Sequence, residues 1–200
     1  MPRAATAPDF RPLAQQALSR AAGAPLSTGN AIELLIDARA NFDAWLAAIR
    51  GARRSILLAN YIVRADAVGK EFLDVLCERA RAGVRVCVMR DWLGCLGQSG
   101  SGFWQPLHDA GGEARAWNPF DPLAPFAWIN RDHRKLIAVD GNIAFISGVC
   151  ISGNWLGDPA RDLPPWRDTG VALRGPAVRD IEAAFAETWA MAGDPLPDGS

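Results

Sequence analysis

The first half of the chain alternates between two hydrophobic spacings. Short apolar runs at 31–36, 55–63 and 84–89 have the length and composition of buried strands. Between them, apolar side chains recur every three or four positions at 41–49 and 66–82, which is the spacing of one helix face. Strands that alternate with helices pair in parallel, and the crossover helices cover the sheet. The pattern therefore predicts an α/β fold with a mixed, largely parallel sheet flanked by helices on both faces.

The second half adds further strands and closes on a helix. Asp140-Gly141-Asn142 separates two short apolar runs and is typical of a tight primed turn between paired strands. We divide the chain into an extension at 1–25, one domain at 26–192 and a loose tail at 193–200. The remaining elements expected are helices at 12–22, 103–110 and 178–189 and strands at 113–117, 136–139, 143–146 and 166–173.

The charge of the chain is almost balanced. Lys and Arg number 21 against 22 Asp and Glu, and the net charge is -1. Proteins that bind nucleic acid non-specifically carry an overall basic field, which this composition does not supply. We therefore do not expect a nucleic-acid partner.

Cysteine usage and hydropathy indicate the cellular compartment in which the protein works. The four cysteines have no C-x-x-C spacing and lie mostly inside apolar segments, which favours reduced, buried thiols over a zinc site or a disulfide scaffold. We expect no metal and no cofactor. No apolar run has the length of a membrane span, and residues 1–25 lack the apolar core of a signal peptide. We expect a cytoplasmic protein that associates at most with a membrane surface.

Candidate chemistry lies at the start of the predicted strand 136–139. His133 and Lys135 stand at i and i+2 and so share one strand face, with their backbone positions about 6 to 7 Å apart. Neutral imidazole is a competent nucleophile, and the lysine supplies a cation for a phosphate oxygen. With Asp140 the spacing is H-x-K-x-x-x-x-D. The spacing alone also occurs by chance, and Asp140 before a glycine is explained by the turn.

The segment from His133 to Gly148 resembles the H-K-D motif of the phospholipase D superfamily. Within that superfamily, the chain is most similar to the amino-terminal lobe of bacterial cardiolipin synthase-like proteins. The resemblance implies a phospholipase D-like half-lobe and a phosphatidyltransferase or phosphodiesterase that acts on phospholipid through a phosphohistidine. The likeness covers 26–192 and includes Gly29-Asn30, Arg53-Arg54-Ser55-Ile56, Tyr61, Gly83-Val84-Arg85-Val86, Asp91-Trp92-Leu93-Gly94, Asn118-Pro119 and Trp166-Arg167-Asp168-Thr169.

The resemblance also implies a second histidine, because in that family two motifs meet around one phosphate. The chain has one further histidine, His108, which has no H-x-K pattern and is expected on a helix surface. Either a second H-K-D lobe of a longer protein or a second copy in a homodimer would complete the site. We favour the second lobe.

Two carboxylates receive roles beside the histidine. Asp140 completes the motif and is grouped with the catalytic residues, although its strand parity predicts that it points away from the phosphate and supports the turn. By resemblance, Asp168 accepts a hydrogen bond from the imidazole of His133 and fixes its tautomer. The alternative for Asp168 is a surface carboxylate at a strand start.

Three further residues are assigned to substrate binding. Most superfamily members carry an asparagine seventeen residues after the motif histidine, and that position is Cys150 here. Ser147-Gly148 also reverses the common glycine-serine order. Asp91 begins a glycine-rich segment just past a strand, where ligands bind in such sheets, although an ordinary connector is also consistent with this composition. We therefore name Ser147, Cys150 and Asp91 as substrate-binding candidates.

An aromatic, proline-broken segment precedes the motif. It contains Trp117, Phe120, Leu123, Phe126 and Trp128 and suits either contact with acyl chains or a lid packed on its own core. Two alternatives to the transferase remain open. One is a dimeric phosphodiesterase or metal-independent nuclease, and the other is a non-catalytic truncated half.

Overall fold

The computed structural model describes residues 10–22, 25–123 and 129–197. Its elements follow the order expected from the hydrophobic spacing. The helices are α1 (Arg11–Ala22), α2 (Asp37–Gly51), α3 (Ala67–Arg81), α4 (Ser101–Asp109) and α5 (Val178–Met191). The strands are β1 (Ala31–Ile36), β2 (Ser55–Asn60), β3 (Arg85–Asp91), β4 (Glu113–Trp117), β5 (Leu136–Val139), β6 (Ile143–Ser147) and β7 (Thr169–Arg174), and two 3-10 helices, η2 (Gly153–Leu156) and η3 (Pro159–Arg161), follow β6.

The strands form one mixed sheet in the order β1-β7-β6-β5-β2-β3-β4. The pairs β2–β3 and β3–β4 are parallel, whereas the other neighbours are antiparallel. Strands β5 and β7 run against the other five. The prediction of a mixed sheet is therefore confirmed, and its parallel part is the region from β2 to β4, where a helix connects each strand to the next.

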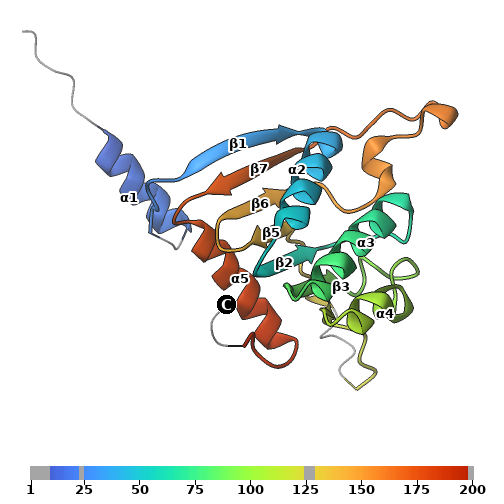
Figure 1. Ribbon diagram of the computed structural model, residues 1–200. Helices are drawn as coiled ribbons and strands as arrows, with labels where there is room; N and C mark the ends of the chain where they lie inside the picture. The colour runs from blue at the N-terminus through green and yellow to red at the C-terminus, as the bar shows by residue number, and fades with distance from the viewer. Residues whose placement is uncertain (1–9, 23–24, 124–128, 198–200) are drawn as a thin grey trace, which may run out of the picture.

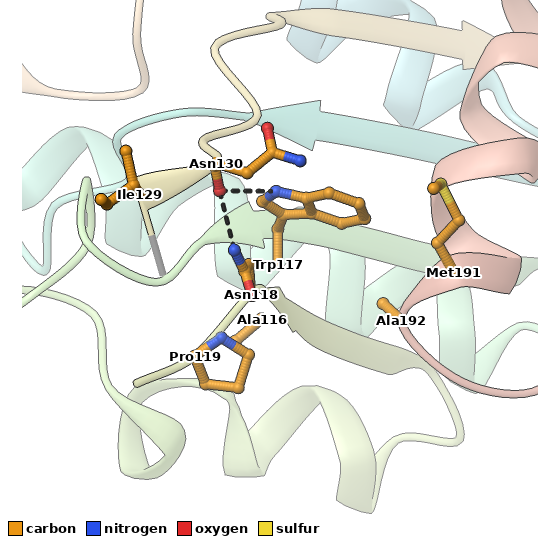
Figure 2. Close-up of a pocket in the computed structure, with 8 residues that line it drawn as sticks. All are labelled: Ala116, Trp117, Asn118, Pro119, Ile129, Asn130, Met191 and Ala192. Atoms are coloured by element: carbon orange, nitrogen blue, oxygen red, sulfur yellow. Dashed lines mark hydrogen bonds between the residues drawn. The ribbon is translucent and has the colours of Figure 1, made fainter. Parts of the chain in front are cut away.

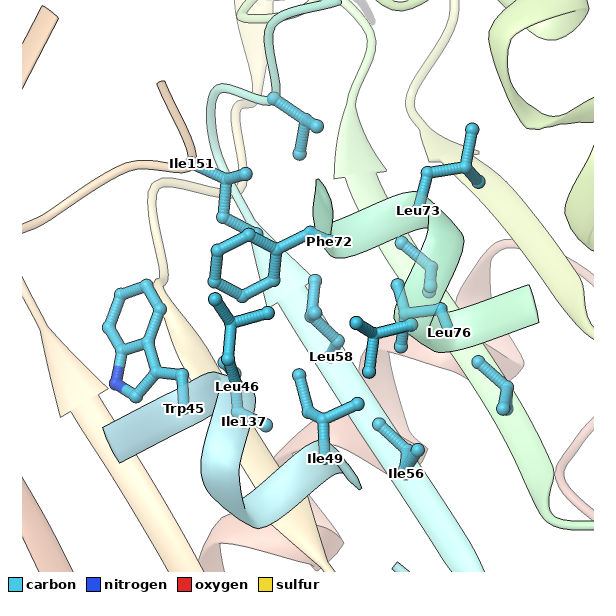
Figure 3. Packing of buried hydrophobic residues seen from close by; sticks show 14 of the residues in the cluster. Trp45, Leu46, Ile49, Ile56, Leu58, Phe72, Leu73, Leu76, Ile137 and Ile151 are labelled. Atoms are coloured by element: carbon cyan, nitrogen blue, oxygen red, sulfur yellow. The ribbon is translucent and has the colours of Figure 1, made fainter. Parts of the chain in front are cut away.

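Helices cover both faces of this sheet, as the sequence predicted (Figure 1). Helices α2, α3 and α4 lie on one face, and α5 lies on the other. Alternate residues of β2 enter separate cores, because Ile56 and Leu58 pack with α2 and α3 whereas Leu57 and Ala59 pack with α5. Figure 3 shows the first core, in which Phe72 from α3 meets side chains from α2 and β2.

The connection between β5 and β6 is the tight turn that the sequence predicts. Asp140 and Gly141 have φ values of 56° and 68°, and the backbone N–H of Asn142 donates to the carbonyl of Val139 at 3.0 Å. Positive φ at both central positions defines a primed turn, whose twist matches that of paired strands. The turn sets the register of β5 against β6, and β5 carries the motif at its other end.

Two strands are shorter than predicted, because β2 ends at Asn60 and not at residue 63, and β7 begins late. The sequence suggests a strand from 166, but β7 begins at Thr169, which pairs with Ile36 at the end of β1. Beyond this pair β1 gives way to α2, because Asp37 has a φ of 62° and turns the chain away. Trp166 and Arg167 therefore have no partner strand.

The described residues also bear on membrane and thiol chemistry. None of their helices combines the length and apolar composition needed to cross a membrane. All four cysteines are buried free thiols, as the sequence predicted.

Burial predicts very different consequences for two phenylalanines. Phe185 of α5 is 1% exposed and packs against Trp189, whereas Phe10, just before α1, is 66% exposed. We expect Phe185→Ala to lower the free energy of unfolding by about 3 to 5 kcal/mol, because it leaves a cavity under the sheet. Phe10→Ala is the matched control and should change it by less than about 0.5 kcal/mol. Urea denaturation of both variants checks this, and equal losses would contradict the observed packing.

Candidate active site

His133 and Lys135 meet at the start of β5. The ammonium Nζ of Lys135 lies 3.1 Å from Nδ1 of His133 and donates to the carbonyl oxygen of His133 at 2.7 Å. Lys135 is 6% exposed, whereas the His133 side chain is open to solvent. The predicted pairing of imidazole and ammonium on one strand face is therefore present, with the cation behind the imidazole.

Tyr61 is a member of this cluster that the sequence analysis left without a role. Its ring centroid is 4.3 Å from that of His133, and Nζ of Lys135 lies 5.1 Å from the Tyr61 ring centroid. The contact arises because β2 pairs with β5, with Ala59 opposite Leu136. Tyr61 follows the end of β2 and so reaches the start of β5. No local pattern predicts this strand order.

The surroundings of Lys135 shape its charge. Burial lowers the pKa of this ammonium below 10.5, and the nearby Cys150, Asp168 and Asp132 act in the opposite direction. A buried ammonium with lowered pKa loses its proton more readily than a surface lysine. The amine remains the strongest hydrogen-bond donor next to the imidazole.

Two of the substrate-binding candidates lie beside Lys135. The backbone N–H of Ser147 donates to the carbonyl of Lys135 at 3.1 Å. The Ser147 hydroxyl Oγ accepts from the N–H of Val149 at 3.0 Å. Cys150 is 1% exposed. Burial raises the pKa of its thiol, and the charge of Lys135 partly opposes that rise. The structure therefore brings both residues to the lysine, with the Cys150 sulfur shielded from solvent.

The expected hydrogen bond from His133 to Asp168 is not formed. The Asp168 carboxylate accepts from Trp155 Nε1 at 3.3 Å and from the backbone N–H of Thr169 at 2.8 Å. His133 has Lys135 on its Nδ1 instead. Asp168 contributes to the site as a negative charge that favours the Lys135 ammonium.

Asp91 holds the segment before the motif and does not face solvent. Its side chain is 1% exposed. One carboxylate oxygen accepts from the N–H of Gly94 at 2.9 Å and lies 3.4 Å from Arg131 Nη1, and the other accepts from the N–H of Asp132 at 3.1 Å. The expectation of a substrate-facing Asp91 is therefore corrected to a role that positions residues 131 and 132.

Asp140 lies at the opposite end of β5 from His133. Its carboxylate accepts from the backbone N–H groups of Arg53 at 2.9 Å, Arg54 at 2.7 Å and Ser55 at 2.9 Å. These groups precede and begin β2. Burial alone raises the pKa of Asp140, but the three N–H donors and the Arg54 charge outweigh it and hold the pKa below 3.8. Asp140 therefore fixes the ends of two strands, as its parity predicted, and does not join the cluster around His133.

A cavity of about 920 Å³ lies beside the chain segment that leads into the motif (Figure 2). Trp117 lines it together with Ile129, Asn130 and Met191. The carbonyl oxygen of Asn130 accepts from Trp117 Nε1 at 3.3 Å. Neither His133 nor Lys135 lines this cavity. Two aromatic residues assigned to the same segment, Phe126 and Trp128, lie outside the described residues.

Two further expectations concern other ligands and the second histidine. Within the described parts of the chain, no three His, Cys, Asp or Glu side chains are grouped so that they could hold a metal ion. His108 is exposed in the last turn of α4, as predicted.

The sheet order and helix placement define a class of fold. The crystal structure of Nuc from Salmonella typhimurium, a phospholipase D family member, matches 84% of this chain and 99% of its own with a TM-score of 0.61 and 16% identity. NucT from Helicobacter pylori matches 80% of this chain and 96% of its own with a TM-score of 0.59 and 11% identity. The chain has the fold of these proteins.

Sequence similarity identifies more specific relatives. Cardiolipin synthase A of Pseudomonas putida (strain W619) is 36% identical over 190 residues, which are 92% of this chain and 38% of the relative. Cardiolipin synthase A of Pseudomonas aeruginosa (strain LESB58) is 35% identical over 183 residues, which are 91% of this chain and 37% of the relative. No family model matches the chain. The resemblance to the phospholipase D superfamily and to bacterial cardiolipin synthases is confirmed, and the chain spans less than two fifths of these relatives' length.

The contacts of Asp140 predict a pH-dependent stabilisation. We expect Asp140→Asn to lower the free energy of unfolding by about 2 kcal/mol at pH 7, because the carboxylate accepts N–H groups on both oxygens, whereas an amide has one acceptor oxygen and an NH2 group that would face a donor. The pKa of Asp140 is lowered in the folded chain, so its contribution is complete above the unfolded value of 3.8 and is lost as pH falls through the folded value. The difference between variant and parent should therefore shrink below pH 3.8.

Denaturation by urea across pH 2.5 to 7 measures this difference. The control is Asp74→Asn, because Asp74 is exposed on α3 and its replacement should change stability by less than about 0.5 kcal/mol. A difference for Asp140→Asn that stays constant down to the lowest pH would contradict the role of its charge.

Proposed function

We propose that this chain is the phosphohistidine-forming half of a phosphatidyltransferase of the cardiolipin synthase type, with residues 26–192 as its phospholipase D-like unit. The observation that carries the proposal is the contact between Lys135 and the solvent-open His133. It is supported by the similarity of 92% of the chain to cardiolipin synthase A. The substrate we propose is a phospholipid phosphodiester.

The proposed reaction begins with attack of His133 Nε2 on phosphorus. A bond from nitrogen to phosphorus forms, and the bond from phosphorus to the leaving alcohol oxygen breaks with its electron pair on that oxygen. A proton donor on the opposite side neutralises the leaving alkoxide. The hydroxyl of a second lipid later gives its proton to that same group and attacks phosphorus, and the nitrogen–phosphorus bond breaks with its electron pair on His133 Nε2. Lys135 stabilises the phosphoryl oxygens, which gain negative charge in the transition state.

The second acid–base group is proposed to come from outside the described residues. His108 is exposed in α4 and makes no contact with the His133 cluster. A single imidazole does not occupy both sides of an in-line displacement. A second H-K-D lobe is the source we favour, and a second copy of the chain is the alternative.

We also propose that the protein works in the cytoplasm at a membrane surface. Leu123 is 92% exposed, and Phe120 and Ile129 are 51% and 64% exposed, all in the segment that precedes the motif. Apolar side chains that stand in solvent suit contact with lipid. The cavity under Trp117 offers room for part of an acyl chain.

The first test is capture of the phosphatidyl group on His133. The protein is mixed with phosphatidylglycerol vesicles, and peptides are analysed by mass spectrometry without acid treatment. We expect the adduct on His133, and we expect His133→Ala to lose both the adduct and turnover by roughly a thousandfold or more, because it removes the nucleophile. His108→Ala is the matched histidine control and should retain both.

The outcomes separate the alternatives. Cardiolipin formation supports the transferase, whereas turnover of another phosphodiester with none of phosphatidylglycerol rejects the proposed substrate. Strong, salt-sensitive DNA binding with DNA cleavage would support the nuclease instead. Light scattering after size exclusion distinguishes the sources of the second group, because a monomer that turns over requires a second lobe in the same chain.

A further inference from the structure

Asn60 is a buried polar residue with nothing to bind. Asn60 is the last residue of β2 and is 2% exposed. Neither its Oδ1 nor its Nδ2 has a hydrogen-bond partner among the described residues. Buried amides are normally paired, because removing them from water costs free energy that a hydrogen bond must offset. A leucine of similar size would fill this position at lower cost, so the amide calls for an explanation.

The strand register places Asn60 beside the candidate active site. Ala59 pairs with Leu136, and continuation of this antiparallel register sets Asn60 across from Lys135. Leu58 and Ile137 of the preceding pair lie in the same core, so Asn60 and Lys135 share that sheet face. Directly opposite side chains of antiparallel strands have Cβ atoms about 5 Å apart, within reach of a lysine ammonium.

The present contact of Lys135 is not the one that nucleophilic attack requires. An ammonium donates hydrogen bonds only, so Nδ1 of His133 accepts from Lys135 and the imidazole proton is on Nε2. Attack through Nε2 needs a lone pair there, and the proton must then move to Nδ1. Two N–H groups cannot face each other at 3.1 Å, so the ammonium must leave Nδ1 for another acceptor.

We propose that Asn60 is a positioning residue whose Oδ1 accepts the Lys135 ammonium when His133 becomes the nucleophile. This role rests on the proposed function, because it is the attack by His133 that displaces the lysine. In this arrangement Asn60 holds the cation and frees Nδ1 to carry the imidazole proton. The Lys135 ammonium then has two positions, one on His133 Nδ1 and one on Asn60 Oδ1, and the second is the one that is empty in this structure.

Several charged or titratable groups face Lys135 and influence its pKa. On its own segment these are His133 and Asp132, and Tyr61 follows β2. From the connection between β6 and β7 come Cys150 and Asp168. Arg90 of β3 pairs with Asn60 on its other side and has an unpaired, buried Nε, so the amide stands between two cations.

A lysine titration tests the proposal without any substrate. The chain has two lysines, Lys135 and Lys70, and Lys70 is exposed on α3 and serves as an internal reference. Carbon-13 labelling of the lysine ε position reports each protonation midpoint by NMR. We expect the Lys135 midpoint to lie below that of Lys70, since burial lowers its pKa.

Two substitutions at Asn60 should move this midpoint in opposite directions. Asn60→Leu removes the amide opposite Lys135 and should lower the Lys135 midpoint, because an apolar neighbour favours the neutral amine. Asn60→Asp adds a negative charge and should raise it. Thermal unfolding should show Asn60→Leu to be at least as stable as the parent, because it replaces an unpaired amide.

The matched control adds the same charge at the other end of β5. Asn142 is exposed in the turn, and Asn142→Asp should leave both lysine midpoints in place. An unmoved Lys135 midpoint in Asn60→Leu, or equal shifts in Asn60→Asp and Asn142→Asp, overturns the proposal. If Asn60→Leu does not fold, the amide holds the fold together and the proposal fails.

Turnover separates this proposal from the proposed function. In an active protein, the alkaline limb of the pH–rate profile should move with the Lys135 midpoint in both Asn60 variants. Shifted midpoints in a protein that turns over no phosphodiester would reject the proposed function alone. Turnover by Asn60→Leu at the parental rate and with an unchanged alkaline limb would reject the role of Asn60 alone.

Discussion

The buried ammonium of Lys135 is the constraint on which the candidate site depends. A lysine that is only 6% exposed is costly unless its surroundings favour the charge, and here a carbonyl, an imidazole, an aromatic ring and the carboxylate of Asp168 supply that environment. The carbonyl and imidazole belong to the neighbouring His133, whereas Tyr61 and Asp168 come from segments far from Lys135 in sequence. Only the completed sheet brings them together, so the charge on Lys135 is a property of the fold.

Carboxylates in this chain serve mainly to hold backbone. Asp140 accepts hydrogen bonds from three N–H groups at the start of β2. Asp91, at the end of β3, accepts hydrogen bonds from the N–H groups of Gly94 and Asp132. Ionised carboxylates suit this task because they accept several hydrogen bonds at once. Within the motif itself, His133 and Lys135 are the residues to which we assign chemistry by proposal, whereas Asp140 fixes the strand that carries them.

Local patterns were sufficient for the elements and for the turn, and insufficient for the site. Apolar spacing predicted β1 and β4 to the residue, and Asp140-Gly141 predicted the primed turn, because both depend on neighbouring residues alone. Strand order depends on contacts between distant segments. The roles of Tyr61 and Asn60 follow from the pairing of β2 with β5, which no spacing reveals. The hydrogen bond expected from His133 to Asp168 is not formed, since Lys135 contacts Nδ1 and Asp168 accepts from Trp155 and Thr169.

The same geometry bears on the proposed need for a second acid–base group. Lys135, Tyr61 and the sheet lie on the inner side of His133, so the imidazole is accessible only from outside. A phosphorus atom that approaches from outside has its leaving group on the side remote from this chain, since displacement is in line. The proposed reaction therefore places the group that protonates the leaving oxygen on the open side of His133, opposite the sheet.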